Sequence, residues 1–172
     1  MQNCTFALDS KKRTMIQRIQ SIYLLLAGVL VGLATVFPLV DFTLSESFAE
    51  GVIGRLSAFA WKYGSDNDWQ TVYNIYSLGI AIIIAAIANI GTIFVFYKRK
   101  LQIKITHYTF ILKIAIIAVI VYFICILQGD DVLSTRPQIG SLLIVISMVF
   151  DWLAVKAIRK DEALVRSIDR IR

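Results

Sequence analysis

Long apolar blocks alternate with short polar stretches along most of the chain. The blocks cover about residues 19–40, 72–97, 107–127 and 138–158. A helix rises about 1.5 Å per residue, so about 20 apolar residues cross a hydrocarbon core of about 30 Å. Solid blocks of this length differ from the amphipathic stripes of soluble helices. The pattern therefore predicts an all-α membrane protein with four transmembrane helices in an antiparallel bundle.

The N-terminal 14 residues differ from the rest of the chain. Residues 1–14 are polar and lack periodicity, so we expect either a disordered tail or a start-site artefact upstream of Met15. Residues 15–172 then form a single four-span domain. A cleaved signal peptide is the alternative for the first block. The apolar stretch is longer than the usual h-region of about 7–15 residues, and no A-x-A-like site follows it, which disfavours cleavage.

The longest polar segment, residues 41–71, separates the first two blocks. Four of its apolar residues follow a nearly helical spacing: Phe48, Val52, Leu56 and Phe59. Ser47 with Glu50 three residues later resembles a capping box. We therefore expect a partly ordered loop containing a short helix that lies against the membrane surface. A small hairpin is the alternative that the sequence leaves open.

Lysine and arginine are distributed unevenly between the two ends of the predicted bundle. An even number of spans places both termini and the 98–106 turn on one side, and loops 41–71 and 128–137 on the other. The first side carries thirteen basic residues: Lys11, Lys12, Arg13, Arg18, Lys98, Arg99, Lys100, Lys104, Arg159, Lys160, Arg166, Arg170 and Arg172. The second carries three: Arg55, Lys62 and Arg136. Because cytoplasmic loops are enriched in Lys and Arg, both termini are predicted to be cytoplasmic.

Composition agrees with a membrane protein. The chain is 58% hydrophobic and 17% charged, against about 45–50% and about 25% in soluble domains. Its net charge of +6 is concentrated beside the spans, so nucleic-acid binding is not expected. The basic residues either only fix the topology or also attract anionic lipid. The predicted partners are the bilayer and a protein, or a second copy of the chain. The candidate lipid or partner surface comprises Lys98, Arg99, Lys100, Lys104, Arg166 and Arg170.

The C-terminal tail, residues 159–172, has the pattern of an amphipathic helix. Leu164, Ile168 and Ile171 recur on one face, and basic residues occupy the others. We expect this helix to continue from the fourth span. It could lie along the membrane, dock to a partner or extend into solvent.

Lys113 and Asp151 are the charged residues that lie deepest within the predicted spans. A charge in the hydrocarbon core costs at least about 2.5–3.5 kcal/mol, so it usually faces protein or water and has a partner. Both residues lie at similar depths from the cytoplasmic side, so adjacent antiparallel helices could bring them into contact. The hypothesis is an intramembrane ion pair. The alternative places both at the interface, with Lys113 snorkelling and Asp151 hydrated.

Asn89 is a further polar residue in the middle of a span. It lies in a run of small residues that would allow close helix approach, and its amide could hydrogen-bond across helices. We interpret it as a helix-packing residue rather than part of a ligand site.

Sequence motifs for catalysis or cofactor binding are lacking. Cys4 and Cys125 form no CxxC pair, and His107 is the single histidine. We therefore predict no metal site, no cofactor and no catalytic residues. The balance favours a non-enzyme without excluding an enzyme.

Three strings carry a family resemblance: MIQRIQSIYLLLAG from Met15, IFVFYKRKLQIKI from Ile93 and RKDEALVRSIDRIR from Arg159. Over about residues 15–172 the chain resembles small four-span membrane proteins of Bacteroidota, a family catalogued as a domain of unknown function. The resemblance implies a bacterial inner-membrane location and supplies no activity. The leading interpretation is a non-catalytic accessory or assembly subunit that binds partners or lipid through its basic cytoplasmic surfaces. The alternative is a small transporter or channel component that uses Lys113 and Asp151.

Overall fold

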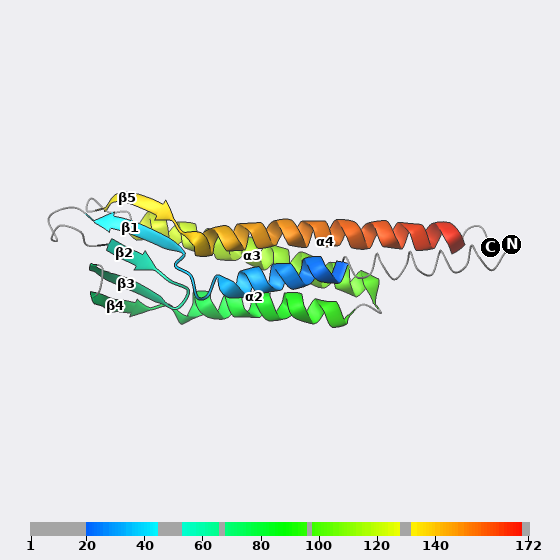
Figure 1. The fold of residues 1–172 in the computed structure, drawn as a ribbon, viewed down its shortest axis with the longest axis horizontal. Helices are drawn as coiled ribbons and strands as arrows, with labels where there is room; N and C mark the ends of the chain where they lie inside the picture. The colour runs from blue at the N-terminus through cyan, green and yellow to red at the C-terminus, as the bar shows by residue number, and fades with distance from the viewer. Residues whose placement is uncertain (1–19, 45–52, 66–67, 96–97, 128–131, 170–172) are drawn as a thin grey trace.

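The described helices lie side by side along the long axis of the molecule, and a β-sheet covers one end (Figure 1). The computed structural model describes residues 20–44, 53–65, 68–95, 98–127 and 132–169. The described helices are Gln20–Leu33, α2 (Tyr76–Phe94), α3 (Arg99–Leu127) and α4 (Ile139–Asp169). The strands are β1 (Val40–Leu44), β2 (Ile53–Leu56), β3 (Ala60–Ser65), β4 (Asp68–Asn74) and β5 (Val132–Pro137).

Three of the helices are long and apolar enough to cross a membrane. The qualifying stretches are Tyr76–Phe94, Lys100–Ile126 and Ile139–Lys160. The first block contributes a shorter apolar helix, Gln20–Leu33, which is about 21 Å long at the usual helical rise. The residues that precede it lie outside the described part of the chain.

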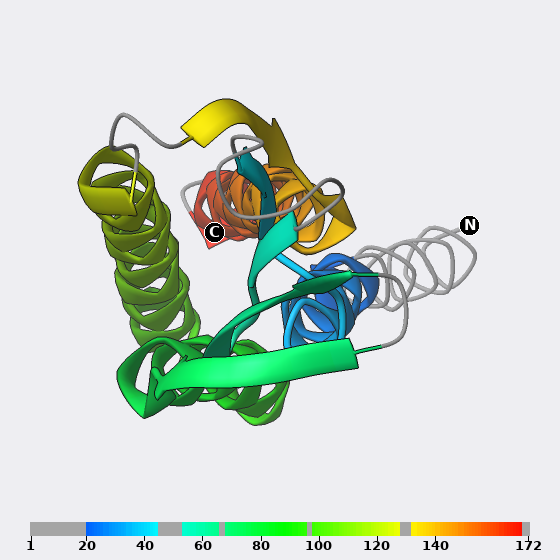
Figure 2. The same cartoon turned by 90° about the vertical axis from the view of Figure 1, so that its left-hand side faces the viewer.

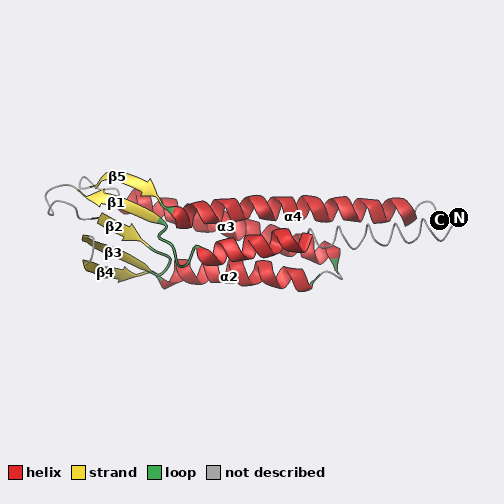
Figure 3. Cartoon of the chain, in the orientation of Figure 1, coloured by secondary structure: helices red, strands yellow, loops and turns green. Residues whose placement is uncertain are grey.

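The prediction of an all-α fold is wrong, because the five strands form one antiparallel sheet in the order β4-β3-β2-β1-β5 (Figure 3). Strand β1 alternates between buried Val40 and Phe42 and the more exposed Asp41 and Thr43, which is the period of a strand with one covered face. Its partners are β2, which is close in sequence, and β5, which is about 90 residues away. Pairing between such distant segments leaves no local signal in the sequence.

The prediction of a short surface helix within residues 41–71 is also wrong for the described residues. Leu56 lies in β2 and pairs with Val40 of β1 and Trp61 of β3, and the β2–β3 and β3–β4 connections continue the chain as hairpins. The helical spacing was misleading because Leu56 and Phe59 enter the same core from a strand and from the turn after it. The proposed capping box of Ser47 and Glu50 lies outside the described residues.

Several predicted boundaries shift for local reasons. The first block leaves its helix at Leu33, where the Thr35 hydroxyl donates to the Gly32 carbonyl at 2.7 Å, before β1 begins. The second block begins in β4, so α2 starts only at Tyr76. The predicted 98–106 turn is mostly the start of α3, β5 occupies much of loop 128–137, and α4 continues to Asp169 through the predicted tail.

Each helix contacts two neighbours around a shared interior, which Figure 2 shows from the end that carries the sheet. The Gln20–Leu33 helix approaches α2 at Gly28, where an added Cβ would lie 3.4 Å from the Ala86 carbonyl. It reaches α4 through Gln20, whose amide donates to the Ala157 carbonyl at 3.2 Å. Helix α3 packs against α2 on one side and α4 on the other.

The junction between sheet and helices is closely packed. Phe42 and Trp61 stack edge to face at 5.1 Å between ring centroids, and buried Leu56, Ile120 and Ile144 belong to the same core. The sheet is therefore continuous with the helical interior and closes that end of it.

Candidate functional site

Three polar side chains from three helices meet in the interior. Lys113 of α3 donates from Nζ to Asp151 Oδ2 of α4 at 2.6 Å. Asn89 of α2 donates from Nδ2 to Asp151 Oδ1 at 3.1 Å. All three residues have a relative exposure of 0%. We call Asn89, Lys113 and Asp151 the buried triad.

The geometry of the buried triad follows from the antiparallel course of α3 and α4. Lys113 lies 14 residues after the start of α3, and Asp151 lies 12 residues after the start of α4, so both occur near the middle of the bundle. Neither side chain reaches the surface, as the alternative of a snorkelling Lys113 and a hydrated Asp151 would require. Pairing neutralises two charges that would each be costly alone in an apolar interior.

One oxygen atom of the buried triad does not accept a hydrogen bond. Asn89 Oδ1 is buried and has no hydrogen-bond partner. The Asp151 carboxylate, in contrast, accepts one hydrogen bond at each oxygen. Asp151 is therefore the centre of the triad, and Asn89 and Lys113 both depend on it.

More polar side chains line the interior than the sequence analysis considered: Gln20, Thr92, Gln102, Thr106, Thr109 and Ser147 are all buried. Their hydrogen bonds go mainly to helix carbonyls, as in Thr92 to Ala88 at 2.6 Å and Thr106 to Gln102 at 2.9 Å. Gln102 donates across helices to the Thr92 carbonyl at 3.4 Å. On α3, Gln102, Thr106 and Thr109 recur at helical spacing with Lys113. This pattern in the sequence predicts a polar face on that helix.

A cavity of about 370 Å³ lies between α3 and α4 beside the buried triad. Thr106, His107 and Phe110 line it from α3. Asp151, Trp152, Val155, Lys156 and Arg159 line it from α4. Thr106 and Asp151 are buried, whereas His107, Trp152, Lys156 and Arg159 are exposed, so the cavity has a buried floor and an exposed rim.

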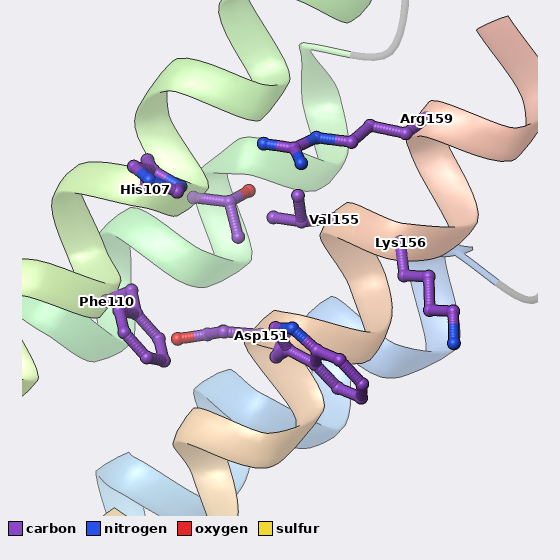
Figure 4. Close-up of a pocket in the computed structure, with 8 residues that line it drawn as sticks. His107, Phe110, Asp151, Val155, Lys156 and Arg159 are labelled. Atoms are coloured by element: carbon purple, nitrogen blue, oxygen red, sulfur yellow. The ribbon is translucent and has the colours of Figure 1, made fainter. Parts of the chain in front are cut away.

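Figure 4 shows how the charged groups around the cavity are oriented. Arg159 extends from α4 toward α3, past Val155, and the Asp151 carboxylate points toward the α3 side near Phe110. Lys156 lies on another side of α4, with Nζ 5.2 Å from the centroid of the Trp152 ring, a cation–π distance. The carboxylate is already paired with Lys113, so the unpaired charge around the cavity is positive.

The basic residues singled out from the sequence lie apart from the buried triad. Lys98, Lys100 and Lys104 are exposed near the start of α3, at the end of the molecule opposite the sheet. Arg99 and Arg166 lie in α3 and α4, but their side chains are outside the described part, as is Arg170 altogether.

A second polar cluster, which the sequence analysis missed, lies on the sheet. Arg55 forms two hydrogen bonds to the Asp41 carboxylate at 2.9 and 3.1 Å and stacks over Trp69 at 4.3 Å. Gln138, immediately before α4, donates to the same carboxylate at 2.9 Å. The cluster ties β1 and β2 to the start of α4, which is a structural role.

The described residues hold no group of three His, Cys, Asp or Glu side chains that could bind a metal ion. His107 is exposed at the cavity rim, and Cys125 is an exposed free thiol on α3. What the described site can do chemically is hold a neutralised charge pair and offer cations to a ligand at its rim.

The sequence comparisons identify a family. The chain matches the model of a domain of unknown function (DUF4293) over residues 16–171, and it therefore belongs to that family. No curated protein shows significant similarity to it.

Proposed function

We propose that this member of the family is a multi-pass membrane protein with all four helices in the bilayer. The supporting observation is that the described helices expose large apolar side chains on their outer faces, while several polar side chains are enclosed among the apolar ones of the interior. The short first helix follows the same rule as the three long ones. Exposed apolar residues occur on every helix, among them Ile22, Leu25, Val29, Ile84, Ile87, Ile111, Val121, Leu142 and Val149. Such a surface is stable in lipid and would aggregate in water.

We further propose that the protein resides in a bacterial inner membrane with both termini in the cytoplasm. The described basic residues Lys98, Lys100, Lys104, Arg159 and Lys160 are all exposed near the helix ends remote from the sheet. The sheet has few basic residues. Arg55 pairs with Asp41, which also lies opposite Arg136 on the next strand. The positive-inside rule then puts the sheet on the outer side.

The function that we infer is that of a non-catalytic accessory or assembly subunit, which binds partners or lipid through its basic cytoplasmic end. One observation carries this inference. The most polar interior groups of the described chain are paired with one another, whereas Lys98, Lys100 and Lys104 are exposed together at one end. Exposed cations gathered at one helix end are suited to binding an acidic partner or an anionic membrane surface.

Affinity purification from native membranes tests this function. A triple variant, Lys98→Gln, Lys100→Gln and Lys104→Gln, is expected to lose co-purifying proteins while remaining in the membrane. Lys62→Gln with Arg136→Gln on the sheet is the matched control and should retain them. If the wild type captures no specific protein, or if both variants lose the same proteins, the accessory role is overturned.

A small transporter or channel component is the second candidate, and the cavity lined by Asp151 favours it. A buried carboxylate at the base of a cavity is a common feature of ion pathways. Beyond the buried triad, however, apolar Ile82, Ile116, Ile120 and Ile144 fill the interior toward the sheet. Purified protein in vesicles would test this candidate through proton or sodium flux. Flux abolished by Asp151→Asn would establish transport, and flux equal to that of empty vesicles would exclude it.

A further inference from the structure

The cavity between α3 and α4 has the features of a ligand site. Its volume of about 370 Å³ falls within the range of about 300–1,000 Å³ that is typical of small-molecule sites. Its floor includes buried Thr106 and Asp151, and its rim carries His107, Lys156 and Arg159. Hydroxyl, imidazole and guanidinium groups around one concave space select an anionic ligand with several oxygen atoms.

The carboxylate in the floor does not oppose an anion. Asp151 has its charge balanced by Lys113 at 2.6 Å, and its side chain is only 1% exposed. Lys156 and Arg159 have no such carboxylate partner among the ion pairs of the described residues. Among the residues that line the cavity, the remaining charge is therefore positive, and Arg159 reaches across the opening toward α3 (Figure 4).

The surroundings of the cavity favour a lipid over a soluble anion. Helical spacing places Ile111 and Ile114 on the same side of α3 as His107, and Val145 and Val149 on the same side of α4 as Trp152. All four aliphatic residues are exposed at 48–54%, so acyl chains could lie along them. Arg159 at the rim lies one residue before the end of the apolar stretch Ile139–Lys160, where lipid head groups are expected.

We propose that this cavity binds the head group of an anionic phospholipid, with the acyl chains on the adjacent apolar surfaces of α3 and α4. Arg159 binds the phosphate, since guanidinium groups pair with phosphate oxygens in a bidentate manner. His107 contributes a further hydrogen bond from the α3 side. This site deepens the proposed function by adding a specific lipid, and it rests on the proposed membrane location.

Two variants distinguish a specific lipid site from general electrostatic attraction. Arg159→Gln removes the central cation, and Val155→Trp fills the cavity while leaving every cation in place. Lys160→Gln is the matched control, because Lys160 is the exposed neighbour of Arg159 and does not line the cavity. Native mass spectrometry would compare phosphatidylglycerol retained by each purified protein with retained phosphatidylethanolamine.

Both Arg159→Gln and Val155→Trp are expected to weaken phosphatidylglycerol retention by about tenfold or more, and Lys160→Gln by less than about twofold. Thermal unfolding in detergent without added lipid checks that each variant is folded. Equal losses in Arg159→Gln and Lys160→Gln would overturn the proposal in favour of diffuse electrostatics. Displacement of the lipid by inorganic phosphate at millimolar concentration would overturn it in favour of a soluble ligand.

The result is independent of the accessory role. Lipid retention is measured on the purified protein, whereas partner capture is measured in native membranes with the Lys98, Lys100 and Lys104 variant. Loss of the lipid with partner capture intact supports the lipid site. Lipid retained by Val155→Trp overturns the site and leaves the accessory role standing.

Discussion

At the scale of single residues, the buried ion pair between Lys113 and Asp151 joins α3 to α4. We expect Lys113→Met and Asp151→Asn each to lower the free energy of unfolding by about 3 kcal/mol, because either change leaves a buried charge unpaired. The double variant removes both charges and should cost clearly less than the sum. Unfolding by SDS titration in mixed micelles would measure this cycle. Additive losses would contradict the pairing, and exposed Lys156→Met is the control with little expected effect.

Asn89 has a smaller and separable role in the same triad. Asn89→Ala removes the hydrogen bond to Asp151 Oδ1 and should cost about 1 kcal/mol, since interhelical hydrogen bonds in membranes average about 0.6 kcal/mol with a maximum near 1.7. Thr92→Val is the control one turn away, because the Thr92 hydroxyl bonds only within α2. The same SDS titration checks both. Equal losses from the two variants would remove any special role for Asn89.

At the scale of elements, substitutions at two glycines of α2 are predicted to change the stability in opposite directions. An added Cβ at Gly79 would collide with the ring of Phe59, whereas one at Gly91 would meet nothing within 4 Å. Gly79→Ala should therefore destabilise the junction between α2 and the sheet by about 1–3 kcal/mol through overpacking. Gly91→Ala should be neutral or stabilise by up to about 1 kcal/mol through helix propensity. Thermal unfolding in detergent would rank the two variants, and the reverse order would contradict the packing of Phe59 on α2.

At the scale of the whole molecule, the proposed orientation can be tested with single cysteines. In a background without Cys4 and Cys125, a cysteine replacing exposed Thr71 on the sheet should react with an impermeant maleimide in spheroplasts. A cysteine replacing exposed Lys104 should react only in inverted vesicles, because the basic end is predicted to face the cytoplasm. Labelling of both from the same side would contradict an arrangement with the sheet outside and the basic end inside.

The helical part of the fold was predictable because its signal is local. Each residue of a span contributes its own transfer free energy, so the apolar blocks locate α2, α3 and α4 without knowledge of their neighbours. The sheet was not predictable in this way. The strands within residues 41–71 are short, so each carries only a weak local pattern. Strand β1 also pairs with β5, which lies about 90 residues away in the sequence.

The candidate site shows the same division. Lys113, Asp151 and Asn89 stand out in sequence because a polar group within an apolar block is costly. Their contacts join residues that are 38 and 62 positions apart in the sequence. Arg159 is recognised as a candidate ligand-binding residue only because the fold places it with His107 at the rim of a cavity. The sequence indicated the basic residues of the turn and tail as the candidate surface, whereas the cavity lies deeper along the same two helices.

The sequence by itself determined that this protein has apolar helices of membrane-spanning length, an uneven distribution of basic residues and a few polar residues within the apolar blocks. These properties sum over individual residues and their immediate neighbours. Only the tertiary structure decided that a sheet closes one end, that Asp151 accepts hydrogen bonds from two other helices, and that α3 and α4 leave a cavity between them. Those features depend on which distant backbone and side-chain groups meet, and this is set by the packing of the whole chain.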